Sequence, residues 1–108
     1  MKLSIPERIM LMGILPKRGS YKEMKASTDF MPKLFFNEEE VRKYDISYKN
    51  LPDGRFEVTF NEEVSTGYAV DVKIPAMVSS IIASKLKEMD ANREIDDKTI
   101  GLYEKFVL

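Results

Sequence analysis

The chain has 108 residues, 17 of them Lys or Arg and 18 Asp or Glu, which gives a formal net charge of −1 at pH 7. This length predicts a single domain spanning residues 1–108, and the balanced charge excludes a global field that would draw the protein to nucleic acid or an anionic membrane. Because the chain has no cysteine and no histidine, it lacks the usual zinc ligands, thiolate nucleophiles and the best proton-transfer side chain, and we expect a non-enzymatic protein without a metal or cofactor.

The first predicted element is a helix that begins after Ser4 and ends near Leu15. Ser4 and Glu7 have the spacing of a capping box, and Pro6 suits the first helical turn, where its missing N–H would have no partner. Apolar residues form several stripes on this segment, so apolar surface nearly encircles the helix. We expect the helix to be buried, either centrally or at an interface. The candidate interface residues are Ile9, Met10 and Met12.

The apolar run at residues 9–15 is too short to be a membrane span, which needs about 20 apolar residues. Charged residues flank it on both sides, and no small-residue cleavage site follows it. We therefore expect a cytoplasmic protein with no membrane partner.

Two more helices are predicted before the chain changes its pattern. Ser20 and Glu23 repeat the capping box, which predicts a helix from Ser20 to about Phe30. Pro32 then breaks that helix. Asn37 caps a short third helix, whose first turn carries three glutamates that interact favourably with the helix dipole.

Alternation of apolar and polar residues follows, which is typical of half-buried antiparallel strands. Residues 46–60 contain a Pro-Asp-Gly turn and predict a β-hairpin. After the turn, Phe56, Val58 and Phe60 lie on one face, and Arg55, Glu57 and Thr59 lie on the other. Residues 61–67 are expected to form a polar loop. Residues 68–74 alternate again and could add a third strand, which would complete a meander.

The rest of the chain predicts two helices. Pro75 opens the fourth helix, and Asp96 or Asp97 caps the fifth. The apolar face of the fourth helix consists of Val78, Ile81, Ile82, Leu86 and Met89. The predicted fold is therefore α+β, with three N-terminal helices, a small antiparallel hairpin or three-stranded meander, and two C-terminal helices.

The turn between the first two helices carries the best candidate site. A helix N-terminus beside clustered positive charge can hold an anion, although this turn lacks the repeated glycines of a phosphate-binding loop. Two interpretations stay open, an ordinary corner with solvated lysines and a patch that meets an anionic ligand or an acidic protein surface. The candidate binding residues are Lys17, Arg18, Gly19, Ser20, Lys22 and Lys25.

Other patterns have simpler explanations. Three helices before a hairpin resemble the order in a winged helix, but the third helix would present its glutamates to DNA phosphates. Glu62, Glu63 and Asp71 show no patterned metal-ligand spacing, so a solvated loop is favoured over a metal or acid–base site. The chain has seven methionines, for which core packing is the default and a homodimer surface stays open.

The chain resembles small, mostly uncharacterised bacteriophage and prophage proteins, which begin with a "PER…ILPK.G" helix and turn and end on "LYEKF". The matching positions are Pro6, Glu7, Arg8, Ile14, Leu15, Pro16, Lys17, Gly19, Leu102, Tyr103, Glu104, Lys105 and Phe106, together with Phe36 and residues 38–40 of an "F.EEE" helix. The chain departs from that pattern at Arg18, where an acidic residue is common, and in its longer sheet-like middle.

The resemblance implies a phage setting and brings no catalytic residues. It implies a cytoplasmic accessory protein that binds and modulates a host protein or nucleoprotein, as an antagonist of host defence would. One alternative is a binder that sequesters an anionic nucleotide, a small molecule that could stack on Tyr21 or Tyr44. Another is a winged-helix-like regulator that binds nucleic acid.

Overall fold

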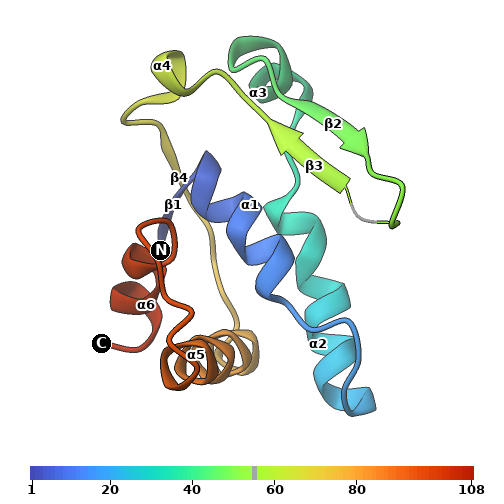
Figure 1. Ribbon diagram of the computed structural model, residues 1–108. Helices are drawn as coiled ribbons and strands as arrows, with labels where there is room; N and C mark the ends of the chain where they lie inside the picture. Colours follow the sequence, from blue (N-terminus) through green and yellow to red (C-terminus); the bar gives the residue numbers. More distant parts are fainter. Residues whose placement is uncertain (55) are drawn as a thin grey trace.

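The computed structural model describes residues 1–54 and 56–108, and the side chain of Phe56 lies outside the description. The sequence predicts which face of the hairpin Arg55 and the Phe56 side chain occupy. Both lie outside the described part of the structure. In the described part, the chain is an α+β protein in which helices accompany two separate two-stranded antiparallel sheets (Figure 1). The predicted fold class is confirmed.

The three predicted N-terminal helices are present, and each begins after its predicted cap residue. At Asn37 the cap is a full capping box with Glu40, which is not predicted. They are α1 (Ile5–Ile14), α2 (Tyr21–Phe30) and α3 (Glu38–Lys43). At the start of α1, the Glu7 N–H donates to the Ser4 hydroxyl over 3.3 Å, and the Ser4 N–H donates to the Glu7 carboxylate over 2.9 Å. A short 3₁₀ helix, η1 (Met31–Leu34), follows α2 at the predicted break.

The predicted hairpin forms from β2 (Ser47–Asn50) and β3 (Phe56–Thr59). Of the two predicted alternatives, the hairpin is confirmed and the three-stranded meander is wrong, because the next strand, β4 (Ala69–Asp71), does not join the hairpin. It pairs in antiparallel fashion with β1 (Lys2–Ser4), with Leu3 opposite Val70. β1 itself is not predicted, since three residues are too few to show an alternating pattern.

A short helix explains why β4 leaves the hairpin. Where the sequence predicts only a polar loop, α4 (Glu62–Ser65) forms, and the side-chain oxygen of Asn61 accepts the Val64 N–H over 3.2 Å. Asn61 is therefore a helix cap. The helical turn carries the chain away from the edge of β3 and towards β1 (Figure 1).

The two predicted C-terminal helices are α5 (Ala76–Ala91) and α6 (Ile100–Phe106). Asp96 does not cap α6, whose N-cap residue is Thr99. The Asp96 carboxylate instead accepts hydrogen bonds from the N–H groups of Lys98 and Thr99, each over 3.0 Å. It therefore caps the turn that precedes the helix. The predicted helix start is thus one turn too early, because an aspartate stabilises an isolated turn in the same way as a helix start.

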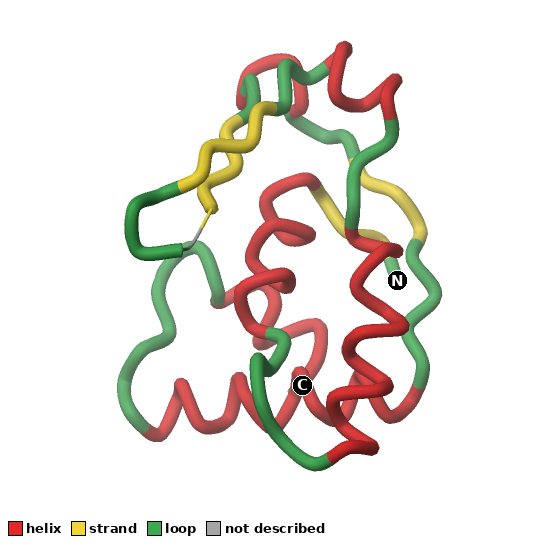
Figure 2. The backbone as a smooth tube through the Cα atoms, turned by 90° about the vertical axis from the view of Figure 1, so that its right-hand side faces the viewer, coloured by secondary structure: helices red, strands yellow, loops and turns green. Residues whose placement is uncertain are grey.

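Helix α1 lies at the centre of the fold and contacts two apolar clusters. The main cluster joins α1 to α2, η1, α5 and α6, and the smaller cluster lies under the hairpin. Three of the five residues predicted for the apolar face of α5 are buried, namely Val78, Ile82 and Leu86. The other two, Ile81 and Met89, are half-buried. Figures 1 and 2 place the hairpin with α3 and α4 at one end of the molecule and α5 at the other. Central burial therefore accounts for the apolar surface around α1.

In the described part of the chain, every helix is too short or too polar to cross a membrane.

Candidate functional site

The basic turn, residues 15–25, comprises the connection from α1 to α2 and the first half of α2, and its residues 17–23 are exposed. Lys17 folds back over α1, where its Nζ donates to the carbonyl oxygen of Met12 over 3.3 Å. This contact places a cation at the negative end of the α1 dipole. Lys25 pairs with Asp29 across one turn of α2 at 3.2 Å. Arg18 and Lys22 are exposed, and neither forms an ion pair or side-chain hydrogen bond within the described residues.

The anion cradle predicted at the start of α2 already holds a carboxylate of the same chain. Glu23 accepts the Ser20 hydroxyl over 2.9 Å and the Ser20 N–H over 3.4 Å. The Ser20 hydroxyl oxygen in turn accepts the Glu23 N–H over 3.2 Å. Gly19 faces this carboxylate, and a Cβ added there would lie 3.8 Å from Glu23 Oε1. A small anion would therefore have to displace Glu23 from the position that the helix N-terminus stabilises.

A groove runs between α1 and the tip of the hairpin, with a volume of about 570 Å³. We call it the α1 groove, and its lining includes Ile9, Met12, Gly13, Lys17 and Val58. It thus brings two predicted interface residues together with one cation of the basic turn. Met12 contributes little surface, because it is only 4% exposed.

Met10 belongs to a different environment, because it packs against the main apolar cluster rather than lining the α1 groove. Of the three predicted interface residues, only Ile9 therefore combines half-exposed surface with a place in the groove. The other large apolar side chains of α1 are buried, apart from the half-buried Met10.

A second hollow, of about 460 Å³, lies on the other side of the basic turn, against α5. We call it the α5 hollow, and its lining includes Gly13, Lys17, Arg18, Ile81, Lys85 and Glu88. Lys85 and Glu88 pair with each other at 3.7 Å. Gly13 and Lys17 line both the α1 groove and the α5 hollow, so the two depressions adjoin at the last turn of α1.

A buried polar network lies beneath α3 and is not predicted from the sequence. The Arg8 guanidinium donates to the Glu40 carboxylate over 2.7 and 3.2 Å, and the Tyr68 hydroxyl donates to it over 2.6 Å. Arg8 also donates to the carbonyl oxygens of Leu34 and Phe35. Arg8 and Glu40 are 3% and 5% exposed. The network therefore joins α1, α3 and the segment before β4.

Two further contacts enclose this ion pair. The Arg8 guanidinium lies 4.3 Å from the centre of the Phe36 ring, within cation–π distance. The Tyr68 ring packs on Tyr44, with 4.5 Å between their centres. Tyr44 is only 3% exposed and so has no free face on which a nucleotide could stack. Tyr21, the other candidate for stacking, is 82% exposed.

Electrostatics in the network favour an ionised Glu40. Burial alone would raise the pKa of Glu40, but hydrogen bonds from Arg8, Tyr68 and the Asn37 N–H outweigh it and lower the pKa from 4.5 to about 2. The hydrogen bond from the Tyr68 hydroxyl to Glu40, together with burial, raises the pKa of Tyr68 to about 12. Each group is therefore held in one protonation state near neutral pH, which suits a structural role better than proton transfer.

We expect the network to make stability depend on acid pH. Because the folded-state pKa of Glu40 lies below the ordinary value of 4.5, at about 2, its contribution is fully present above pH 4.5 and is lost as the pH falls towards 2. The loss should amount to about 3 kcal/mol. Chemical denaturation of the wild type and of Glu40→Gln over this pH range would measure it. The difference in the free energy of unfolding between the wild type and Glu40→Gln should shrink as the pH falls. A constant difference would contradict the low pKa of Glu40.

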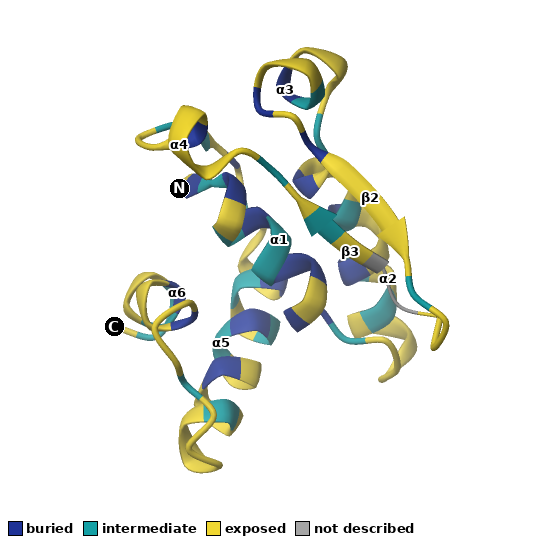
Figure 3. Cartoon of the chain, turned by 45° about the horizontal axis from the view of Figure 1, so that its top comes forward, coloured by how far each residue is buried: buried dark blue, intermediate teal, exposed yellow. Residues whose placement is uncertain are grey.

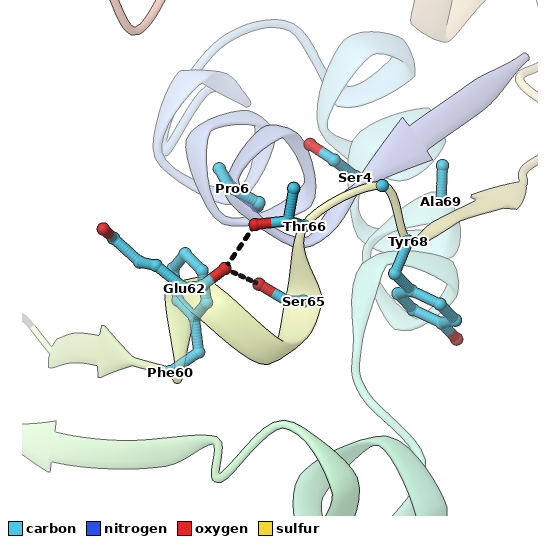
Figure 4. Close-up of a pocket in the computed structure, with 9 residues that line it drawn as sticks. Ser4, Pro6, Phe60, Glu62, Ser65, Thr66, Tyr68 and Ala69 are labelled. Atoms are coloured by element: carbon cyan, nitrogen blue, oxygen red, sulfur yellow. Dashed lines mark hydrogen bonds between the residues drawn. The ribbon is translucent and has the colours of Figure 1, made fainter.

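The hollow shown in Figure 4 contains hydroxyl groups, but its geometry carries no evident chemistry. The Ser65 and Thr66 hydroxyls both donate to the backbone carbonyl oxygen of Glu62, over 3.2 and 2.9 Å. Figure 4 also shows the Tyr68 side chain directed away from the serine and threonine hydroxyls. The hydroxyl groups are thus used to hold α4 and the turn after it.

The carboxylates of this region do not gather into a site. Glu62 and Glu63 are exposed in the first turn of α4, whereas Asp71 on β4 pairs with the amino group of Met1 at 2.8 Å. That pair lowers the pKa of Asp71. No group of three or more acidic side chains suited to hold a metal ion occurs in the described part of the chain.

Comparisons of the chain with protein families, curated proteins and solved structures found no match.

Proposed function

We propose that this chain is a non-enzymatic, phage-type accessory protein that binds a host protein or nucleoprotein in the cytoplasm and alters its activity. The observation that carries the proposal is the meeting of apolar and cationic surface at the last turn of α1. Ile9, in the middle of α1, and Val58 line the α1 groove, and the exposed Arg18 lines the adjoining α5 hollow. Protein interfaces combine an apolar centre with a polar rim in this way, and they are enriched in Arg and Tyr.

Sequestration of a nucleotide has less support. The α2 N-terminus is capped by Glu23, and Tyr44 is buried against Tyr68. These two features remove the phosphate cradle and one of the two stacking residues on which that hypothesis depends.

Reading of DNA by α3 also has less support. Glu38 and Glu39 are exposed at its first turn and would repel phosphates, and Glu40 is committed to Arg8. A nucleoprotein partner would therefore be engaged through its protein component.

A homodimer has less support than a partner of another kind. The reason to expect a homodimer is the apolar surface that nearly encircles α1. Most of that surface packs against the two apolar clusters of the same chain. The half-exposed Ile9 alone offers too little surface for a stable symmetric interface.

Reversing the unpaired cations tests the proposal. We expect Arg18→Glu/Lys22→Glu to weaken partner binding by about tenfold or more with little change in melting temperature, because exposed charges contribute little to stability but steer association. Lys17 is left unchanged, since its Nζ holds the end of α1. Binding to the partner captured from host lysate would be titrated with each variant at two salt concentrations.

The matched control is Lys73→Glu/Lys98→Glu, which changes the net charge by the same amount at exposed lysines outside the α1 groove and the α5 hollow. It should bind as the wild type does. An equal loss of binding in both double variants would mean that only the net charge matters. No loss of binding in either would contradict a role for the basic turn. A nucleotide that co-purifies with the protein, identified by mass spectrometry, would favour the sequestration alternative.

A further inference from the structure

The hairpin lobe consists of α3, β2, β3 and α4, which lie within the described part of residues 37–68. Backbone hydrogen bonds join these elements to one another. The Ile46 N–H donates to the carbonyl oxygen of Val41 over 3.0 Å, and the Asn61 N–H donates to that of Tyr44 over 2.8 Å. The end of α3 is therefore bonded to the residues just before and just after the hairpin, and the lobe is held together by its own backbone.

The rest of the chain has its own apolar core. Among the described residues, the main cluster contains twelve buried apolar residues, which lie at positions 3–34 and 72–102. The smaller cluster contains three, of which Ile5 comes from α1, whereas Tyr44 and Ile46 come from the lobe. Figure 3 shows α1 between the hairpin and α5. Since stabilisation by burial scales with the apolar surface buried, the few buried side chains of the smaller cluster hold the lobe less firmly than the main cluster holds the other helices.

A buried ion pair adds to this attachment. Arg8 on α1 donates to Glu40 on α3 over 2.7 and 3.2 Å, and the Tyr68 hydroxyl donates to the same carboxylate. When an ion pair separates, both charges regain water, which offsets part of their lost attraction. Arg8 also keeps two acceptors outside the lobe, the carbonyl oxygens of Leu34 and Phe35. Separating the lobe from α1 therefore costs less free energy than unpacking the main cluster.

We infer that the hairpin lobe opens as one unit while the main cluster stays packed, and that the ion pair of Arg8 and Glu40 holds it closed. Native proteins open locally in cooperative units of this kind, which coincide with compact motifs. Opening exposes Ile5 and Ile9 on α1, which belong to the smaller cluster. It also widens the α1 groove, because Ile9 lines that groove from α1 and Val58 lines it from the lobe. This motion is independent of the proposed partner.

Hydrogen exchange at two backbone amides distinguishes this motion from unfolding of the whole chain. The Asn61 amide, which is bonded to Tyr44, reports on the lobe, and the amide of the fully buried Leu86 on α5 reports on the main cluster. In the wild type we expect the Asn61 amide to be less protected by about tenfold or more. Exchange at Asn61 should also accelerate less steeply with urea than exchange at Leu86, because opening of the lobe exposes less surface.

Two matched substitutions provide the decisive comparison. Ile82→Val and Ile46→Val each remove one methyl group from a buried isoleucine, the first in the main cluster and the second in the lobe. Ile82→Val should lower the protection of Leu86 by about fivefold and leave that of Asn61 unchanged, because the lobe opens without unpacking Ile82. Ile46→Val should lower both, because its contacts are lost in both open states. An equal loss at both amides in Ile82→Val would show one cooperative unit and overturn the inference.

A further pair of variants tests the role of the ion pair. Arg8→Met should lower the protection of Asn61 by about a hundredfold or more, because the Glu40 carboxylate is left buried without its cation. Complete loss of protection at Asn61 with Leu86 still protected would also support that role. The control, Lys25→Met, removes an exposed ion pair within α2 and should change the protection of Asn61 by less than about fivefold. Equally small changes in both variants would overturn the assignment of the ion pair as the contact that holds the lobe closed.

Discussion

Replacing Arg8 with methionine should lower the free energy of unfolding by about 3 to 5 kcal/mol, because it leaves the buried Glu40 carboxylate without its cationic partner. Methionine has a similar length and removes the guanidinium, which donates to Glu40 and to the carbonyl oxygens of Leu34 and Phe35. Those acceptors would lose the Arg8 donors, and the Glu40 carboxylate would do so where only 5% of the residue is exposed. Equilibrium unfolding in urea at neutral pH would measure the loss.

Two further variants make this result specific. Arg18→Met removes an exposed arginine, so it should change stability by less than about 1 kcal/mol. The double change Arg8→Met/Glu40→Leu should recover much of the loss, because replacing both buried charges by apolar groups is often neutral. If Arg8→Met alone were as stable as the wild type, the network would not join α1 to α3 as the distances indicate.

The variant Ile82→Asp should unfold the protein at room temperature. Ile82 is fully buried in the middle of α5, so the change removes an apolar side chain worth about 1.5 to 3 kcal/mol and buries a carboxylate without a partner. The sum approaches the whole stability of a small domain, about 5 to 15 kcal/mol. Circular dichroism and a thermal melt would detect the loss.

Lys87→Asp is the matched control on the same helix, where the side chain is exposed, and it should retain a cooperative melt. An unchanged melting curve for Ile82→Asp would remove the central turn of α5 from the core.

Local signals predict most of the helices in this fold. Ser4, Ser20 and Asn37 each cap a helix at the predicted residue, because a capping box depends only on residues three positions apart. The hairpin is predicted for the same reason, since its turn and alternation lie within one short segment.

Pairings between distant segments are not predicted. Nothing near Leu3 indicates that it pairs with Val70, and the neighbouring hairpin was the default partner for β4. A four-residue helix, α4, carries the chain away from that partner. Short elements of this kind depend on tertiary contacts more than on propensity.

The buried ion pair leaves one signal in the sequence that the prediction did not use. Arg8 lies three residues after Ile5 and three before Leu11, on a stripe that is otherwise apolar and buried. A charged residue on such a stripe needs a buried partner. Sequence spacing cannot choose that partner among the three consecutive glutamates of α3, and only the fold directs Glu40 inward. The candidate site shows the same limit, because α1 and the hairpin tip are brought together only in three dimensions.

The pairing of β1 with β4 sets the order in which the chain can assemble. Leu3 and Val70 lie opposite each other although more than half of the sequence separates them, so closing this contact costs more chain entropy than forming α1, α2 or the hairpin. We therefore expect the local elements to form first and the pairing of β1 with β4 to form later. Ser4 is both the last residue of β1 and the cap of α1. We therefore expect the first strand in the sequence to be among the last elements to pair, although its final residue is already fixed by the local capping box of α1.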